Sequence, residues 1–239
     1  MITSPHRFIG IILNLMTRSI LIECLWLITK NFVRIQKEKS ALLLQQAFVK
    51  RSFDLVLSFF GLSITWWLIL LAWLVSSFDT RSNGFFIQKR VGRDGKIFKI
   101  VKIKTMRPID EVTTTVTRRG DPRITPLGVF FRRTKIDELP QLWNVFIGDM
   151  SFVGPRPDVL GFADRLHGEA RAMLSIRPGI TGPATLKYRN EEEILSQQPD
   201  PDSYNLHVIW PDKVTINLYY IRTWSLRRDI RYILETVFH

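Results

Sequence analysis

The chain has 239 residues, which is enough for one domain of ordinary size with a buried core and an extension. Its 34 Lys and Arg residues outnumber its 22 Asp and Glu residues, and the net charge of +12 favours anionic partners: nucleic acid, lipid headgroups or phosphorylated substrates. A single cysteine, Cys24, excludes an internal disulfide and a cysteine zinc cluster, and fits a reducing compartment. The 7 Trp and 16 Phe residues favour a water–lipid interface over a DNA groove.

Residues 1–49 form an N-terminal extension with apolar and amphipathic segments. Polar and charged side chains interrupt the apolar segment 8–28, so we expect an interfacial or loosely inserted helix there and not a clean membrane span. This segment lacks a small-x-small cleavage site, which argues against a removed signal peptide. Residues 35–48 have the pattern of an amphipathic helix, which leads into the pair Lys50 and Arg51.

Residues 55–78, LVLSFFGLSITWWLILLAWLVSSF, contain no charged side chain over 24 positions. A straight helix of this length would measure about 36 Å, enough to cross a hydrocarbon core of about 30 Å. A helix buried in a soluble core rarely lacks polar residues on every face over such a length. The segment therefore indicates contact with lipid.

The topology of this segment follows from its flanks. Basic residues precede and follow it, and the positive-inside rule would place both flanks on the cytoplasmic face. We therefore predict a re-entrant membrane helix over residues 50–79, which bends near residues 61–67 and returns to the face where it entered. No proline is available for the bend, so the hydroxyls of Ser63 and Thr65 are expected to bond to carbonyls one turn back.

Residues 80–239 are predicted to form a compact domain of the α/β (α+β) class. Residues 84–107 should form two short strands around the turn at residues 92–95, because Asp-Gly suits a tight hairpin and apolar residues alternate with lysines. A loop with two prolines leads into a helix after residue 126, and a second helix is expected to begin at Asp137. Residues 148–159 are expected to be a turn-rich loop without regular structure, and residues 160–174 a helix.

Three loops of this domain combine Gly, Pro and Arg, at residues 118–123, 154–157 and 177–183. Proline fixes the backbone, glycine allows a ligand to approach closely, and arginine offers a planar fork to phosphate oxygens. One such loop is common on protein surfaces. Three of them around a pair of carboxylates favour a site that handles phosphate.

The carboxylate pair lies in RRTKIDELPQLWNV, residues 132–145, where Asp137 and Glu138 directly follow three cations. A helix that starts here, with Pro140 in its first turn, would hold both acids at its N-terminus, where the dipole and the free N–H groups favour anions. The cations should lower the carboxylate pKa values further, which suits a nucleophile or a metal ligand and not a general acid. Adjacent helical positions cannot straddle one sugar ring, which disfavours a glycosidase pair. An ordinary helix start with a first-turn acid explains the same residues, and this segment alone leaves both interpretations open.

Four segments together resemble a known family in their order and spacing: KRSFD, FFIQKRVGRDGKIFKIVKIKTM, DPRITPLGVFFRRTKIDELPQLWNVFIGDMSFVGPRP and PGITGPA. They are similar to the bacterial sugar transferases, the monotopic polyprenyl-phosphate phosphoglycosyl transferases that begin capsule, O-antigen and glycoprotein glycan assembly. The resemblance extends from residue 50 to about residue 182, and the chain resembles the minimal catalytic form. It implies a small membrane-associated catalytic domain with a re-entrant membrane helix and interfacial amphipathic helices.

The resemblance implies a reaction in two steps. Asp137 would attack the β-phosphate of a UDP-sugar, UMP would leave, and the phosphosugar would pass from the enzyme to polyprenyl (undecaprenyl) phosphate. Mg²⁺ would be the cofactor, bound at Asp137, and Glu138 would assist the aspartate or the metal. Lys50 and Arg51 would lie at the lipid headgroup boundary. The residues expected to bind substrate phosphates are Arg132, Arg156, Lys104 and Arg123.

The resemblance also implies a location at the bacterial inner (cytoplasmic) membrane, with the catalytic domain (residues 80–239) on the cytoplasmic face and in contact with membrane lipid. It implies no nucleic-acid partner and leaves room for a homo-oligomer. Two departures from the family pattern bear on these expectations. The family's membrane helix usually breaks at a Ser-Pro pair, where Trp66 and Trp67 stand here, and Lys104 replaces an arginine, which keeps the charge but loses the bidentate fork.

A different class of protein fits part of the sequence: a membrane-tethered, non-catalytic binder of nucleic acid or anionic lipid. Its support is the net charge and the segment 225–238, whose apolar and basic faces are typical of an interfacial helix. Release of UMP from UDP-sugars that depends on Asp137 would separate the enzyme from the binder.

Overall fold

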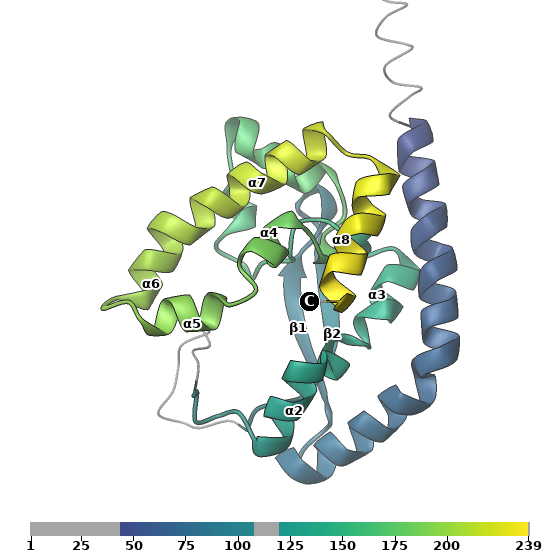
Figure 1. Ribbon diagram of the computed structural model, residues 1–239, viewed down its shortest axis with the longest axis vertical. Coiled ribbons are helices and arrows are strands. Elements are labelled where there is room, and N and C mark those ends of the chain that lie inside the picture. The colour runs from purple at the N-terminus through teal and green to yellow at the C-terminus, as the bar shows by residue number, and fades with distance from the viewer. Residues whose placement is uncertain (1–43, 108–119, 239) are drawn as a thin grey trace, which may run out of the picture. The chain divides into compact units, whose positions relative to one another are not determined.

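The computed structural model describes residues 44–107 and 120–238 (Figure 1). The chain divides into two compact units, Met1–Val49 and Lys50–His239, and of the first unit only residues 44–49 are described. The helix predicted for residues 8–28, and most of the one predicted for residues 35–48, therefore lie outside the described residues. The second unit is a helix-rich α/β domain, which confirms the predicted class.

A long helix, Leu44–Thr80, is apolar enough to cross a membrane, and only 11% of its most apolar window is buried. Figure 1 shows that this helix bends along its length. Ser63 Oγ donates to the Phe59 carbonyl at 2.9 Å. Thr65 Oγ1 donates to the Gly61 carbonyl at 2.7 Å, and the predicted hydroxyl-to-carbonyl bonds are thereby confirmed. The helix bends without a proline, while its return to the same membrane face stays a prediction.

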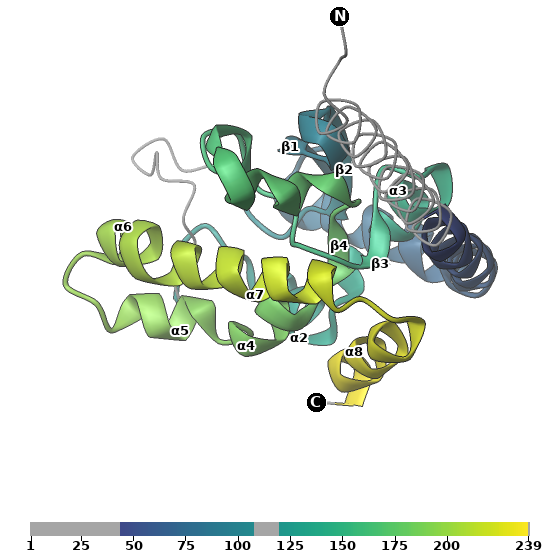
Figure 2. The same ribbon diagram turned by 90° about the horizontal axis from the view of Figure 1, so that it is seen from above.

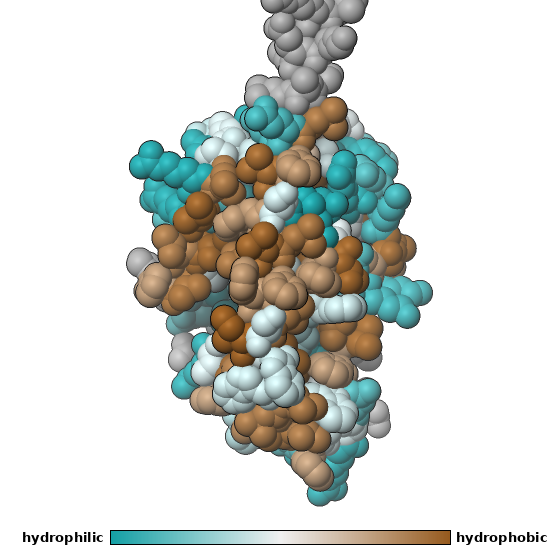
Figure 3. All heavy atoms as spheres, turned by 90° about the vertical axis from the view of Figure 1, so that its right-hand side faces the viewer, coloured by the Kyte–Doolittle hydropathy of each residue, from teal (hydrophilic) through white to brown (hydrophobic). Residues whose placement is uncertain are grey.

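Large apolar side chains are exposed along the long helix, and they gather as a brown band on the face that Figure 3 shows. The exposed side chains of this helix include Leu55, Val56, Phe59, Phe60, Ile64, Trp66, Trp67, Leu70, Leu71 and Leu74. Trp143 and Ile147 of helix α3 (Gln141–Ile147) are exposed as well. Exposed apolar patches of this size are typical of contact with lipid or with an apolar partner.

The predicted hairpin is confirmed. Strands β1 (Phe85–Val91) and β2 (Ile97–Ile103) pair antiparallel, and a short 3₁₀ turn, Arg93–Gly95, connects them. The next helix, α2 (Pro126–Thr134), begins where the prolines predict, because Thr125 caps it by accepting a hydrogen bond from a backbone N–H three residues later.

The prediction of a loop without regular structure over residues 148–159 is wrong. Strand β3 (Ser151–Val153) lies in this segment and pairs in parallel with β4 (Gly179–Thr181). A Cβ on Gly179 would lie 2.1 Å from the Gly154 nitrogen, and a Cβ on Gly182 would lie 2.5 Å from the Gly154 carbonyl oxygen. Glycine is therefore required where the two backbones meet.

The helix predicted for residues 160–174 is also wrong as a single element. The chain forms two 3₁₀ segments instead, Ala163–Arg165 and Gly168–Ser175. The second begins at Gly168, whose φ of 58° lies in the left-handed region that an α-helix cannot include.

The C-terminal part of the domain is helical. Its α-helices are α4 (Pro183–Lys187), α5 (Glu191–Ser196), α6 (Pro201–Tyr204), α7 (Trp210–Arg222) and α8 (Leu226–Phe238). A π-helical turn, Asn205–Ile209, joins α6 to α7. Helix α7 packs against α4, as Figure 2 shows, and α8 packs against β3 and β4. The helix expected near the C-terminus is present, and its interfacial position stays a prediction.

Candidate active site

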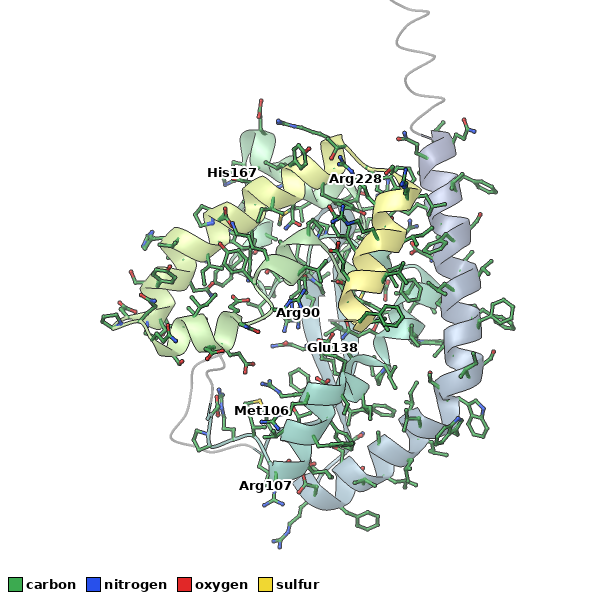
Figure 4. All side chains as sticks on the ribbon, in the orientation of Figure 1. Arg90, Met106, Arg107, Glu138, His167 and Arg228 are labelled. Carbon is green, nitrogen blue, oxygen red and sulfur yellow. The ribbon has the colours of Figure 1, made fainter. Side chains whose placement is uncertain are left out.

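Asp137 and Glu138 lie in a short 3₁₀ turn, Ile136–Glu138, between α2 and α3. Lys135 ends α2 in the left-handed region, with φ of 58°, and redirects the chain into this turn. The prediction that an α-helix begins at Asp137 is wrong, because α3 begins only after Pro140. Figure 4 labels Glu138 among the side chains of this region.

Both carboxylates line an open cavity of about 570 Å³. Its wall comes from β2, from the end of α2, from the loop after β3, and from α4, α5, α7 and α8. The lining residues are Lys102, Arg132, Arg133, Lys135, Asp137, Glu138, Arg156, Asp158, Thr181, Ala184, Thr185, Leu186, Tyr188, Arg189, Asn190, Glu191, Glu192, Glu193, Trp210, Lys213, Asn217, Glu235 and Thr236. A cavity of this size with many cations can take a phosphorylated small molecule.

Glu138 is held between two cations. Its Oε1 accepts a hydrogen bond from Lys102 Nζ at 2.8 Å and one from Arg156 Nη2 at 3.1 Å. Burial alone would raise the pKa of Glu138, but Arg156 and Lys102 outweigh it and hold the pKa well below its ordinary value. Glu138 is therefore ionised at every pH of interest, which makes it a poor proton carrier and a good anchor for the two cations.

Asp137 has the opposite electrostatic character. Its side chain is buried, and among the described residues its Oδ1 has no hydrogen-bond partner. Burial and the charge of Glu138 raise the pKa of Asp137 to about 6, against the pull of Lys102 and the cations of α2. The sequence led us to expect a lowered pKa, and this is wrong for Asp137 because burial and the charge of Glu138 outweigh the cations. The carboxylate is still mostly ionised above pH 7, with one oxygen free for a bond.

Of the four predicted phosphate-binding residues, Arg132 and Arg156 line the cavity. Arg132 forms an ion pair with Glu192 at 2.8 Å, so it connects α2 to α5 at the wall. Lys104 and Arg123 lie outside the cavity lining. Lys104 follows the end of β2 and donates to the Ser82 hydroxyl, while Arg123 forms an ion pair with the nearby Asp121 at 2.6 Å.

Lys50 and Arg51 have protein partners for their charges. Lys50 Nζ lies 2.5 Å from Asp229 Oδ2 of α8, and Arg51 donates to the carbonyl oxygens of Val145 and Phe146 at 2.7 and 2.8 Å. These bonds fasten the long helix to α3 and α8. The expected role of both residues at the headgroup boundary stays a prediction.

The sequence reasoning missed Lys102, Arg133 and Lys135, which line the cavity beside the carboxylates. The alternation of lysines in β2 was the available signal for Lys102, but it did not tell which lysine faces the site. Arg133 and Lys135 were noted only as neighbouring charges.

Asp137 offers one carboxylate oxygen to a magnesium ion. Among the described residues, no three His, Cys, Asp or Glu side chains group as a metal site of their own. Mg²⁺ is commonly held by one or two carboxylates together with substrate phosphates and water. The free Oδ1 of Asp137 can supply one such carboxylate oxygen at the open cavity.

Comparison with known proteins identifies a family. A family model described as bacterial sugar transferase matches residues 44–239. The "UDP-galactose-lipid carrier transferase" of Erwinia amylovora is 35% identical over 210 residues, which cover 80% of this chain and 40% of that protein. The "UDP-glucose:undecaprenyl-phosphate glucose-1-phosphate transferase" of Escherichia coli (strain K12) is 34% identical, covering 80% of this chain and 39% of that protein.

The chain thus spans about two fifths of the length of these curated relatives. It spans 83% of the "Exopolysaccharide production protein ExoY" of Sinorhizobium fredii (strain NBRC 101917 / NGR234), to which it is 30% identical over 79% of its own length. The family match covers most of the chain and includes the Asp-Glu pair in its cation-lined cavity. The chain belongs to the bacterial sugar transferase family.

Proposed function

We propose that this protein transfers a phosphosugar from a UDP-sugar to polyprenyl phosphate and so starts the assembly of a bacterial glycan. The observation that carries the proposal is Asp137: a buried carboxylate with a free oxygen, in a cation-lined cavity. The printed names of two relatives, a UDP-galactose-lipid carrier transferase and a UDP-glucose:undecaprenyl-phosphate transferase, support the same substrates.

In the first step, a carboxylate oxygen of Asp137 forms a bond to the β-phosphorus of the UDP-sugar. The bond from that phosphorus to the bridging oxygen breaks, and its electron pair leaves with UMP. Asp137 suits this role because its pKa of about 6 keeps it mostly ionised at neutral pH while burial leaves it poorly solvated. The product is a phosphosugar on the aspartate.

In the second step, an oxygen of polyprenyl phosphate attacks the same phosphorus and the bond to Asp137 breaks. Arg156 keeps N–H groups beyond the one that binds Glu138, and these can hold phosphate oxygens in both steps. Glu138 fixes the positions of Lys102 and Arg156, which is a role without proton transfer. When bound, Mg²⁺ would lie at Asp137 and offset phosphoryl charge.

The exposed apolar face of the long helix supports a place at a membrane, where the lipid substrate is found. We propose the cytoplasmic face of the inner membrane, because basic residues flank the helix on both sides. The re-entrant topology belongs to this proposal.

The test uses the protein purified in detergent with Mg²⁺, a panel of UDP-sugars, and UMP release as the readout. Without polyprenyl phosphate, mass spectrometry of the protein should find a phosphosugar adduct that maps to Asp137. With polyprenyl phosphate, turnover should become continuous. An adduct on another residue would overturn the nucleophile, and absence of UMP with every sugar would favour the non-catalytic binder.

A further inference from the structure

Two polar atoms in the wall of the Asp137 cavity lack hydrogen-bond partners among the described residues. They are Oδ1 of Asn217, in α7, and Oγ1 of Thr185, in α4. Both atoms are buried, and Asn217 is only 4% exposed. Both residues line the cavity, and the helices that carry them pack against each other.

A buried polar atom without a partner costs about 1–3 kcal/mol, so a ligand that donates a hydrogen bond to Asn217 Oδ1 would remove this cost. The amide nitrogen of Asn217 lies 3.7 Å from the sulfur of Met173, which orients the side chain. The oxygen is therefore a hydrogen-bond acceptor at the cavity, and the Thr185 hydroxyl can both donate and accept.

The charges near these atoms differ from those beside Asp137. Lys213, in the same helix as Asn217, donates to both carboxylate oxygens of Glu191 at 2.7 Å, so its charge is already paired. Asp158 adds another carboxyl to the cavity lining. Arg189, which follows α4 in the lining, donates to the Leu186 carbonyl and keeps N–H groups for a phosphate. What distinguishes Thr185 and Asn217 is their unpartnered neutral polar atoms, which suit a neutral group with hydroxyls.

We propose that Thr185 and Asn217 form the subsite for the sugar of the nucleotide sugar and hydrogen-bond its hydroxyl groups. A sugar hydroxyl can donate to Asn217 Oδ1, and another can accept from the Thr185 hydroxyl. The pair thereby discriminates between sugars that differ at one hydroxyl, because a wrong epimer leaves a buried polar atom without a partner. This inference rests on the proposed function.

The uracil ring is the competing occupant. Its recognition edge carries two carbonyl acceptors around a single N–H donor, and it needs donors from the protein. The uracil N–H could donate to Asn217 Oδ1, but of these two residues only the Thr185 hydroxyl could donate to the two uracil carbonyls, whereas every sugar hydroxyl both donates and accepts. Separate measurements on sugar and nucleotide distinguish the two.

The test compares Thr185→Val and Asn217→Leu, which remove the polar atoms at similar volume, with the wild type. The readouts are kcat/KM of UMP release for the best UDP-sugar and for its single-hydroxyl epimer, and the inhibition constant of UMP. We expect kcat/KM for the best sugar to fall about tenfold, the loss of one hydrogen bond to substrate. The preference over the epimer should shrink by a similar factor, and inhibition by UMP should not change.

Two matched variants serve as controls. Thr185→Ser keeps the hydroxyl and should retain the sugar preference. Thr215→Val removes an exposed hydroxyl of α7 that donates to the Pro211 carbonyl of the same helix, and it should behave as wild type. Melting curves check folding, and the Thr185→Val and Thr185→Ser pair decides the matter if Asn217→Leu is not folded.

The outcomes separate the hypotheses. Unchanged selectivity in active Thr185→Val and Asn217→Leu overturns the sugar subsite and leaves the proposed function intact. Equal losses for both sugars, together with weaker inhibition by UMP, assign the pair to the uridine, through its uracil or its ribose, instead. Failure of the wild type to release UMP from any sugar overturns the proposed function itself.

Discussion

Replacing Asp137 by Asn should abolish turnover and also stabilise the folded protein at neutral pH. Burial and Glu138 raise the pKa of Asp137 from 3.8 to about 6, so the fold holds an ionised carboxylate that water would solvate better. This rise of about 2.2 corresponds to roughly 3 kcal/mol, at 1.36 kcal/mol for each pKa unit. The amide of Asn brings N–H donors that need partners, at about 1 kcal/mol or more. The net gain in the free energy of unfolding should be about 1–2 kcal/mol.

The gain has a defined pH dependence. A carboxyl whose pKa is higher in the folded than in the unfolded state destabilises the fold at high pH, and this penalty disappears as the pH falls below the unfolded pKa. For Asp137 the penalty is nearly full above pH 6 and small near pH 4. The variant and the wild type should therefore differ most at about pH 7–8 and converge near pH 4.

The assay is thermal melting in detergent micelles across this pH range, with UMP release measured on the same samples. A gain of 1 kcal/mol corresponds to about 2–4 °C for a chain of this size. Asp94→Asn, which changes an exposed aspartate of the hairpin turn, is the matched control and should not shift the melting temperature. A melting temperature at pH 7.5 that is equal to or below the wild type, or a gain that persists at pH 4, would refute the reasoning.

Further predictions concern chemistry, packing and topology. Because Asp137 must be ionised to attack, kcat/KM should fall about tenfold between pH 7 and pH 5; a flat profile would exclude it as the titrating nucleophile. Arg156→Ala should lower kcat/KM by about 10- to 100-fold, since a charge-assisted contact contributes about 1.5–3 kcal/mol; unchanged kinetics would make its loop purely structural. Asp229→Asn, which leaves a lysine ammonium without its carboxylate, should cost on the order of 3 kcal/mol in denaturant unfolding; an unchanged midpoint would contradict the ion pair. In a background without the native cysteine, single cysteines at Ser40 and Ser82 should both resist an impermeant maleimide in intact cells; labelling of the first alone would show a spanning helix.

Sequence reasoning succeeded where the signal is local. The hairpin follows from the alternation of apolar residues and lysines around Asp-Gly, and α2 follows from the prolines of the loop before it. The polar bonds that accompany the bend also come from neighbours one turn apart, at Ser63 and Thr65. Each of these features depends on residues a few positions away.

The failures depend on partners that lie far along the chain. Strand β3 has only three residues, which is too short to show the alternation of apolar and polar side chains that marks a strand. Its partner β4 lies nearly 30 residues later in the chain. The pKa of Asp137 depends on burial and on the charge of Glu138. Glu138 is bound by Lys102 of β2 and by Arg156 of the loop after β3, and both are far from it in the sequence. Lys104 and Lys102 are two positions apart, and only the folded sheet shows which one faces the cavity.

The contact of Gly154 with Gly179 and Gly182 shapes how a saturation mutagenesis screen on this protein should be interpreted. None of the three has a side chain to act on a substrate, yet a single methyl group at Gly179 or Gly182 would meet the Gly154 backbone at 2.1 to 2.5 Å. Relief of that clash has to displace the loop that carries Arg156 and Asp158 into the cavity. Substitution of these glycines would therefore reduce activity as strongly as substitution of a reactive residue. A screen that scores growth alone would wrongly assign the glycines to the catalytic centre. Measuring protein abundance beside growth separates the two groups, because the reactive carboxylate can be lost without lowering abundance while the glycines cannot.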